Sequence, residues 1–212
     1  MPILTKDREY RRIDLRGLEV EGGEDGGMIV EGYACTFNQP YTLWDDGEYR
    51  VTEQIDADAF AGCDMSDVIM QYDHQGRVFA RMSNGTLALR TDEHGLKMRA
   101  DLSGTELGRQ LYQEIRDGYT DKMSFGFSVE PETDRIEQHK DEETQRIEIL
   151  RTITKIRKLY DVSAVSLPAN DATEISATRS FCDGVIAEAM EERHAAEERQ
   201  RKIRVIKTLL EV

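Results

Sequence analysis

The segment that most constrains the fold is DKMSFGFSV, residues 121–129, in which large apolar side chains alternate with small ones. Successive side chains of a β-strand point to opposite faces of the sheet, so this alternation is typical of a strand. The large side chains would share one face, which predicts that this face packs into a core. Ser124 and Gly126 would share the other face, where the missing side chain of glycine leaves room for another group to approach the serine.

Other segments carry the same β signature of branched and aromatic residues bounded by turn residues. They are residues 28–37, residues 66–74, a hairpin over 85–102 that turns at Asp92 to Gly95, and residues 145–168. The acidic residues 131–144 hold no core content and predict a loop. The pattern as a whole predicts a mainly β domain (α+β) that is closed or barrel-like, with helices packed outside.

Two helices are expected. The first covers residues 103–118, where Ser103 and Glu106 match a capping box and Gly118 follows the apolar stripe. The second lies in residues 180–212, which are rich in helix formers and balance acidic with basic residues. Near its end runs an apolar stripe of Ile203, Ile206, Leu209 and Leu210.

We therefore divide the chain into an N-terminal arm, a β domain and a helical tail, with bounds 1–27, 28–179 and 180–212. The arm is expected to be loose or to form an edge strand. The middle of the tail has almost nothing to bury, so we expect a separable helix that covers a partner's surface. Docking of the tail onto its own β domain remains the alternative.

Charge and composition exclude several classes of function. The net charge of −14 repels phosphate groups, which argues against nucleic acid as a partner. No apolar run approaches the ~18 residues that a membrane-spanning helix needs, and the N-terminus has no apolar signal-peptide core. We therefore expect a cytoplasmic protein with no membrane partner. The three cysteines are too scattered for a disulfide framework or a paired metal motif, so no metal and no cofactor are expected.

Three residues suit nucleophilic chemistry. A serine nucleophile needs a base within hydrogen-bond reach, and the base needs a group that orients it. Ser124 is the best-placed serine, His74 ends an apolar strand beside a loop, and Asp161 is an acid within an apolar strand. Each also has an ordinary reading: His74 as a surface residue, Ser124 as a small core residue, and Asp161 as the ion-pair partner of Lys155 or Arg157.

The sequence also resembles a known family. The segments GYACTFN, YDHQ, TELGRQLYQEIRDGYTDKMSFGFSV and RKLYDVSAVSLPAND follow one another as in the prohead serine proteases of tailed bacteriophages, which are related in fold to herpesvirus assembly proteases. The resemblance covers roughly residues 28–178. It implies a closed antiparallel β-barrel ringed by helices. It also implies His74 as the catalytic histidine, Ser124 as the nucleophile and Asp161 as the third member, where many relatives carry Glu.

The resemblance further implies an endopeptidase of phage head maturation that cleaves the scaffold segment of the major capsid protein and itself. It implies a homodimer or higher oligomer that acts in the host cytoplasm, inside the assembling prohead. Two alternatives stay open. One is a non-catalytic scaffold or capsid-assembly factor on the same fold, and the other is a cysteine nucleophile at Cys35.

Overall fold

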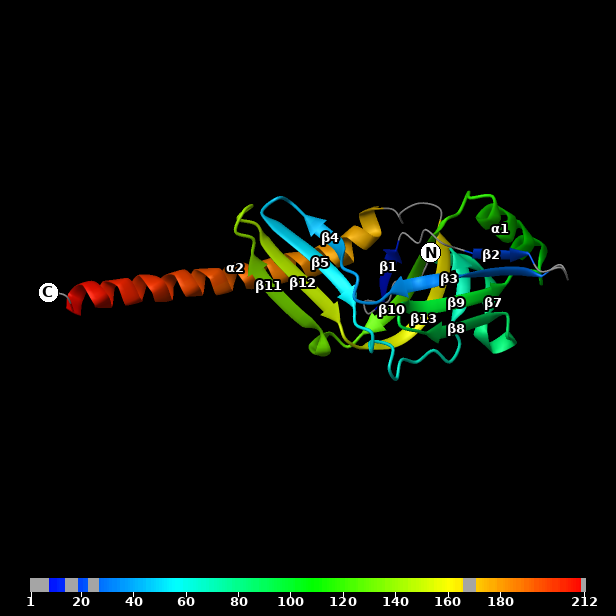
Figure 1. The fold of residues 1–212 in the computed structure, drawn as a ribbon, viewed down its shortest axis with the longest axis horizontal. Coiled ribbons are helices and arrows are strands. Elements are labelled where there is room, and N and C mark those ends of the chain that lie inside the picture. Colours follow the sequence, from blue (N-terminus) through cyan, green and yellow to red (C-terminus); the bar gives the residue numbers. More distant parts are fainter. Residues whose placement is uncertain (1–7, 14–18, 23–26, 166–170, 211–212) are drawn as a thin grey trace.

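The structure, a computed structural model, describes residues 8–13, 19–22, 27–165 and 171–210. Within these ranges the chain forms three β-sheets and two α-helices (Figure 1). The expectation of a mainly β fold is therefore confirmed.

The first sheet carries the DKMSFGFSV segment. Its strands in spatial order are β1 (Glu9–Ile13), β10 (Lys122–Val129), β13 (Ile156–Val165), β6 (Ile69–Tyr72) and β7 (Gln75–Arg81). The alternation in β10 is confirmed on its apolar face, because Met123, Phe125 and Phe127 are all fully buried. The small face is buried as well, so this strand is covered on both sides.

The second sheet contains the predicted hairpin. Its strands in spatial order are β2 (Glu19–Gly22), β3 (Met28–Thr36), β9 (Gly95–Asp101) and β8 (Leu87–Thr91). A short 3₁₀ helix, η1 (Met82–Asn84), precedes β8. The helix α1 (Glu106–Arg116) follows β9, but its cap differs from the predicted one. Thr105 rather than Ser103 is the N-cap, and its hydroxyl accepts a hydrogen bond from the backbone N–H of Gly108.

The third sheet includes a strand that we did not predict. Its strands in spatial order are β11 (Arg135–Lys140), β12 (Ile147–Ile153), β5 (Tyr49–Ile55) and β4 (Tyr41–Asp45). Residues 131–144 were expected to form a loop, and this is wrong because they contain η2 (Pro131–Thr133) and β11. Every residue of β11 is exposed. Backbone pairing with β12 holds this strand in place. Its sequence therefore carries no hydrophobic pattern that would predict a strand.

The expectation of a closed antiparallel barrel is wrong. All three sheets formed by the described residues are open, each ending in two strands that pair on one side only. Two pairs, β13 with β6 and β12 with β5, are also parallel. The sheets stay open because their edge strands do not pair with one another, and the buried side chains fall into two apolar clusters. The larger cluster lies among the first two sheets and α1 and includes Ile55 and Ile153 at the ends of two third-sheet strands, while the smaller one joins the third sheet to the second helix.

The second helix, α2 (Asp171–Leu210), is longer than expected and projects away from the sheets (Figure 1). Its buried residues Cys182, Val185 and Ala189 pack against the third sheet. Ile203 of the predicted stripe is 52% exposed, and the side chains of the other three stripe residues lie outside the described residues. No helix in the described ranges is long and apolar enough to cross a membrane.

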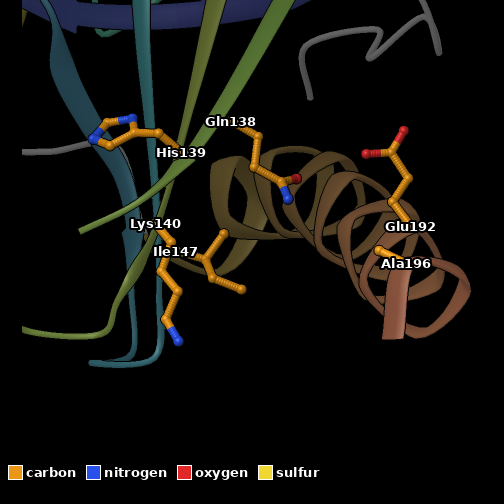
Figure 2. Close-up of a pocket in the computed structure, with 6 residues that line it drawn as sticks. All are labelled: Gln138, His139, Lys140, Ile147, Glu192 and Ala196. Carbon is orange, nitrogen blue, oxygen red and sulfur yellow. The ribbon is translucent and has the colours of Figure 1, made fainter. Parts of the chain in front are cut away.

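An open pocket lies where α2 passes the third sheet (Figure 2). Its lining comes from β11, β12 and α2 and consists of Gln138, His139, Lys140, Ile147, Glu192 and Ala196. None of the three predicted site residues belongs to this lining.

Candidate active site

His74 lies in the tight turn that joins β6 to β7. Tyr72 pairs with Gln75, so Asp73 and His74 form a two-residue loop. Their φ angles are +49° and +55°, as a type I′ turn requires. Asp and His are among the few side chains that tolerate this left-handed region, which otherwise favours glycine. The turn is fixed to the neighbouring strand, because the N–H of Asp73 donates to the carbonyl of Ala164 over 3.0 Å.

Ser124 and Asp161 come from the adjacent strands β10 and β13. Asp161 lies directly opposite Gly126, and Ser124 lies opposite Ser163. A Cβ atom on Gly126 would stand 2.5 Å from Oδ2 of Asp161, which is closer than non-bonded atoms approach. The glycine therefore makes the space that the Asp161 carboxylate occupies, which accounts for the small face seen in the sequence.

The three predicted residues form one hydrogen-bonded chain. His74 Nδ1 is 2.5 Å from Asp161 Oδ1, and His74 Nε2 is 2.6 Å from Ser124 Oγ. The carboxylate and the hydroxyl thus lie at the two ring nitrogens of one imidazole. In this arrangement the imidazole can take a proton from the hydroxyl while the carboxylate fixes its tautomer and balances its charge.

Asp161 is held by more than His74. The hydroxyl of Ser163 donates to its Oδ1 over 2.7 Å, and the guanidinium of Arg8 pairs with its Oδ2. Burial alone would raise the pKa of this fully buried carboxyl group. The hydrogen bond and charge of His74, together with Ser163 and Arg8, outweigh burial and lower its pKa. Asp161 is therefore ionised at neutral pH.

Strand β1 lies over this chain of residues, a contact that the sequence did not predict in detail. The Ser124 hydroxyl is within 2.9 Å of the Arg11 carbonyl, and the Tyr10 ring lies 4.4 Å from the His74 ring. Ser124 is consequently only 2% exposed. The arm was expected to be loose or an edge strand, and the edge strand is what these residues form. The contacts across β1 join residues far apart in sequence, so no local pattern could reveal them.

Cys35, the alternative nucleophile, lies in the larger apolar cluster. It is fully buried, and burial raises the pKa of its thiol to about 12. A thiol of this kind is protonated at neutral pH, so Cys35 is a poor nucleophile. The described part of the chain also contains no group of three or more His, Cys, Asp or Glu residues that could hold a metal ion.

Comparisons with known proteins identify the class. Residues 13–186 match the caudovirus prohead serine protease family. The match spans most of the chain, so the protein belongs to this family, and membership supports a serine-peptidase role in phage head maturation.

No curated protein gives a significant match. Among solved structures, the bacteriophage T4 capsid assembly protease gp21 aligns with 12% identity and a TM-score of 0.37, covering 75% of this chain and 98% of that chain.

Proposed function

We propose that this protein is a serine endopeptidase whose catalytic residues are Ser124, His74 and Asp161. The observation that carries the proposal is the unbroken sequence of hydrogen bonds from Asp161 through His74 to Ser124. Both distances lie within or just below the range expected for a nucleophile and its base. Asp161 reaches His74 directly, so its short side chain needs no bridging water.

In the proposed mechanism, Ser124 Oγ attacks the carbonyl carbon of a peptide bond as His74 Nε2 takes its proton. The imidazolium then returns the proton to the departing amine. Asp161 accepts the hydrogen bond from Nδ1–H throughout, which keeps Nε2 free to act as the base. A water molecule, activated by the same imidazole, hydrolyses the acyl-enzyme and restores the serine.

The proposed substrates are the scaffold segment of the major capsid protein and the protease itself. These follow from membership of the prohead protease family, which also supports action inside the assembling prohead of an infected cell. A homodimer or higher oligomer remains part of the proposal. The division of the chain into an arm (1–27), a protease domain (28–179) and a helical tail (180–212) is also part of the proposal.

One observation favours a second candidate, a non-catalytic assembly factor. Ser124 is 2% exposed and its hydroxyl contacts the Arg11 carbonyl, so no substrate reaches it while β1 is in place. A protein that had lost its activity could keep such a covered site. The two candidates differ in whether Ser124 is ever reactive.

Covalent labelling separates them. A fluorophosphonate probe is incubated with the full chain, and the modified residue is mapped by peptide mass spectrometry. We expect one labelled residue, Ser124, with no labelling in Ser124→Ala. The matched control is Ser83→Ala, which removes an exposed hydroxyl that is not part of the proposed triad and should label like the parent. Absence of any label on Ser124 under conditions that process the capsid protein would reject the nucleophile assignment.

A further inference from the structure

Strand β1 occupies the position that a peptide substrate would take. It is the edge strand of the first sheet and pairs in antiparallel register with β10, placing Arg12 opposite Ser124 and Arg11 opposite Phe125. Addition of an extended peptide to a sheet edge is a common mode of peptide recognition, in which backbone hydrogen bonds give affinity and side-chain pockets give specificity. The edge that β1 covers is also the edge that carries the proposed nucleophile.

The peptide bond between Arg11 and Arg12 lies at the nucleophile. The carbonyl oxygen of Arg11 is 2.9 Å from Ser124 Oγ, and His74 Nε2 contacts the same Oγ at 2.6 Å. Arg11 therefore supplies the carbonyl group that lies beside the Ser124 hydroxyl and its base. The Ser124 hydroxyl donates this hydrogen bond to the carbonyl oxygen, so the Arg11 carbonyl carbon must turn toward Oγ before a cut that follows Arg11.

The Arg11 side chain fills a buried acidic recess. Arg11 is 7% exposed, and its guanidinium contacts both carboxylate oxygens of Glu53, with the Nη2–Oε2 distance at 3.0 Å. Its Nη2 also lies 2.5 Å from Glu9 Oε2. Glu9 belongs to β1 itself, so the carboxylate that the rest of the protein offers to Arg11 is that of Glu53. Contact of a guanidinium with both oxygens of one carboxylate is a strong, charge-assisted arrangement that favours a basic side chain.

Glu53 is held in the recess by residues outside β1. The hydroxyl of Tyr41 donates to its Oε1 over 2.6 Å, and Arg151 Nη1 donates to its Oε2 over 2.7 Å. Burial alone would raise the pKa of Glu53, but the charges of Arg11 and Arg151 outweigh burial and lower its pKa. The carboxylate therefore stays charged, and Arg151 and Tyr41 hold it in place whether or not Arg11 is present.

We propose that Glu53 sets the specificity of this protease for a basic residue, Arg or Lys, immediately before the scissile bond, and that β1 is an internal substrate cut between Arg11 and Arg12. This inference rests on the proposed serine-peptidase function and adds to it the class of substrate. Glu53 is a specificity residue, since it contacts the substrate side chain and takes no part in proton transfer.

The chemical step balances with groups on this chain and water. Ser124 Oγ forms an ester bond to the Arg11 carbonyl carbon as the Arg11–Arg12 bond breaks, and His74 passes the hydroxyl proton to the new Arg12 amine. Water then cleaves the ester, giving an Arg11 carboxylate and a free Ser124 hydroxyl. The covered state seen in the structure precedes this cut, and release of β1 opens the edge of β10 to other substrates.

The first test follows the full chain itself. Intact-mass analysis of the purified protein should show loss of residues 1–11, and Ser124→Ala should keep them. Arg11→Lys should still be cut after residue 11, whereas Arg11→Gln should reduce cutting there by about 10²-fold, because a neutral side chain loses the charged contact with Glu53. Arg90→Gln, which changes an exposed arginine of β8, serves as the matched control and should be cut like the parent.

The second test uses peptides, so that it does not depend on folding of an Arg11 variant. The wild-type full chain is given DREYRRIDLR, which reproduces residues 7–16, and the same peptide with Gln in place of Arg11. Products are identified by mass. We expect the Arg peptide to be cut after Arg11 with a kcat/KM about 10²-fold above that of the Gln peptide. Glu53→Gln should bring this ratio close to one, a change that a purely structural role of Glu53 would not produce.

The outcomes distinguish the two proposals. If Ser124 is labelled and capsid protein is processed, but no cut follows Arg11 in the chain or in the peptide, the specificity inference is wrong while the serine-peptidase function stands. Equal cutting of the Arg and Gln peptides overturns the inference in the same way. If Ser124 is neither labelled nor required for any cleavage, the proposed function itself fails.

Discussion

The candidate active site and the docked part of helix α2 are both buried, but different forces hold them. At the site, Asp161, His74 and Ser124 are joined by directional hydrogen bonds. In α2, the small apolar side chains of Cys182 and Val185 lie against the third sheet. A hydrogen-bonded chain fails when one member is lost, because the remaining polar groups stay buried without partners. Apolar contacts are non-directional, so a change there is expected to alter stability by small increments.

The largest difference should appear when the site loses its nucleophile. Ser124→Ala is expected to reduce capsid-protein processing by roughly 10⁶-fold, leaving only residual catalysis. The fold should survive, since alanine fits wherever serine does and only one hydroxyl is lost. Processing is measured by co-expression with the capsid protein and gel analysis. Normal processing by this variant would show that another residue is the nucleophile.

The next largest effect concerns the carboxylate. Asp161→Asn keeps the shape of the side chain but removes the charge that stabilises the imidazolium, so the rate should fall by about 10²- to 10⁴-fold. The loss should show mainly in kcat, because Asp161 contacts His74 and not the substrate. Ser163→Ala removes one hydrogen bond to the same carboxylate and should have a clearly smaller effect. A rate within about twofold of the parent for Asp161→Asn would mean that another group orients His74.

A smaller effect is expected from closing the space beside Asp161. The Cβ atom of Gly126→Ala would meet Asp161 Oδ2 at 2.5 Å and Tyr10 Cε1 at 2.8 Å, so both groups must shift. Displacement of a catalytic group by about 1 Å can cost roughly 10²-fold in rate. Overpacking should also lower the free energy of unfolding by about 1–3 kcal/mol. Gly104→Ala is the matched control, because a Cβ there meets nothing within 4 Å.

Sequence reasoning found the parts of this site that local patterns encode. The alternation in β10 located Ser124 and the small face, and the resemblance to prohead proteases joined it to His74 and Asp161. For Gly126, the sequence predicted only that the missing side chain leaves space beside Ser124. That the space is filled by the Asp161 carboxylate depends on the register between β10 and β13, which no single segment specifies.

The features that the sequence missed lack a local hydrophobic signal. Strand β11 is exposed throughout and is specified by pairing with β12, so its composition resembles a loop. The ion pair of Arg11 with Glu53 joins two distant segments, and charge alone does not say which acid meets which base. Closure into a barrel was inferred from strand content and the resemblance, whereas it depends on how sheet edges pair.

Acid should destabilise the site region through its buried carboxylates. The pKa values of Asp161 and Glu53 are lowered in the folded protein, by His74 and Arg11 respectively, against the raising effect of burial. In the unfolded chain they return to about 3.9 and 4.3, so below about pH 5 the unfolded state binds more protons. Their contribution is therefore complete above the unfolded pKa values and is lost as the pH falls through the folded ones.

Urea unfolding at a series of pH values from 7 to 3 measures this loss. Asp134 acts in the opposite direction, because burial raises its pKa. Exposed carboxyl groups such as Asp64 and Asp67 also have lowered pKa values and act in the same direction as Asp161 and Glu53, so we expect a net decrease in the free energy of unfolding as the pH falls. A constant value between pH 5 and 3 would contradict the ion pairing at Asp161 and Glu53.

The smallest effect is expected in α2, where a substitution should raise the free energy of unfolding instead of lowering it. Gly184 lies within the helix, and a Cβ there would meet nothing within 4 Å. Glycine in a helix interior lowers stability by about 0.5–1 kcal/mol relative to alanine, because glycine loses more backbone conformational entropy on folding. Gly184→Ala should therefore raise the free energy of unfolding by about that amount and leave peptidase activity unchanged. The same substitution at Gly126 lowers both, so the pair compares the two regions directly. Thermal and urea unfolding with a parallel peptidase assay make the measurement, and a destabilised Gly184→Ala would show that this helix packs more closely than its open surface indicates.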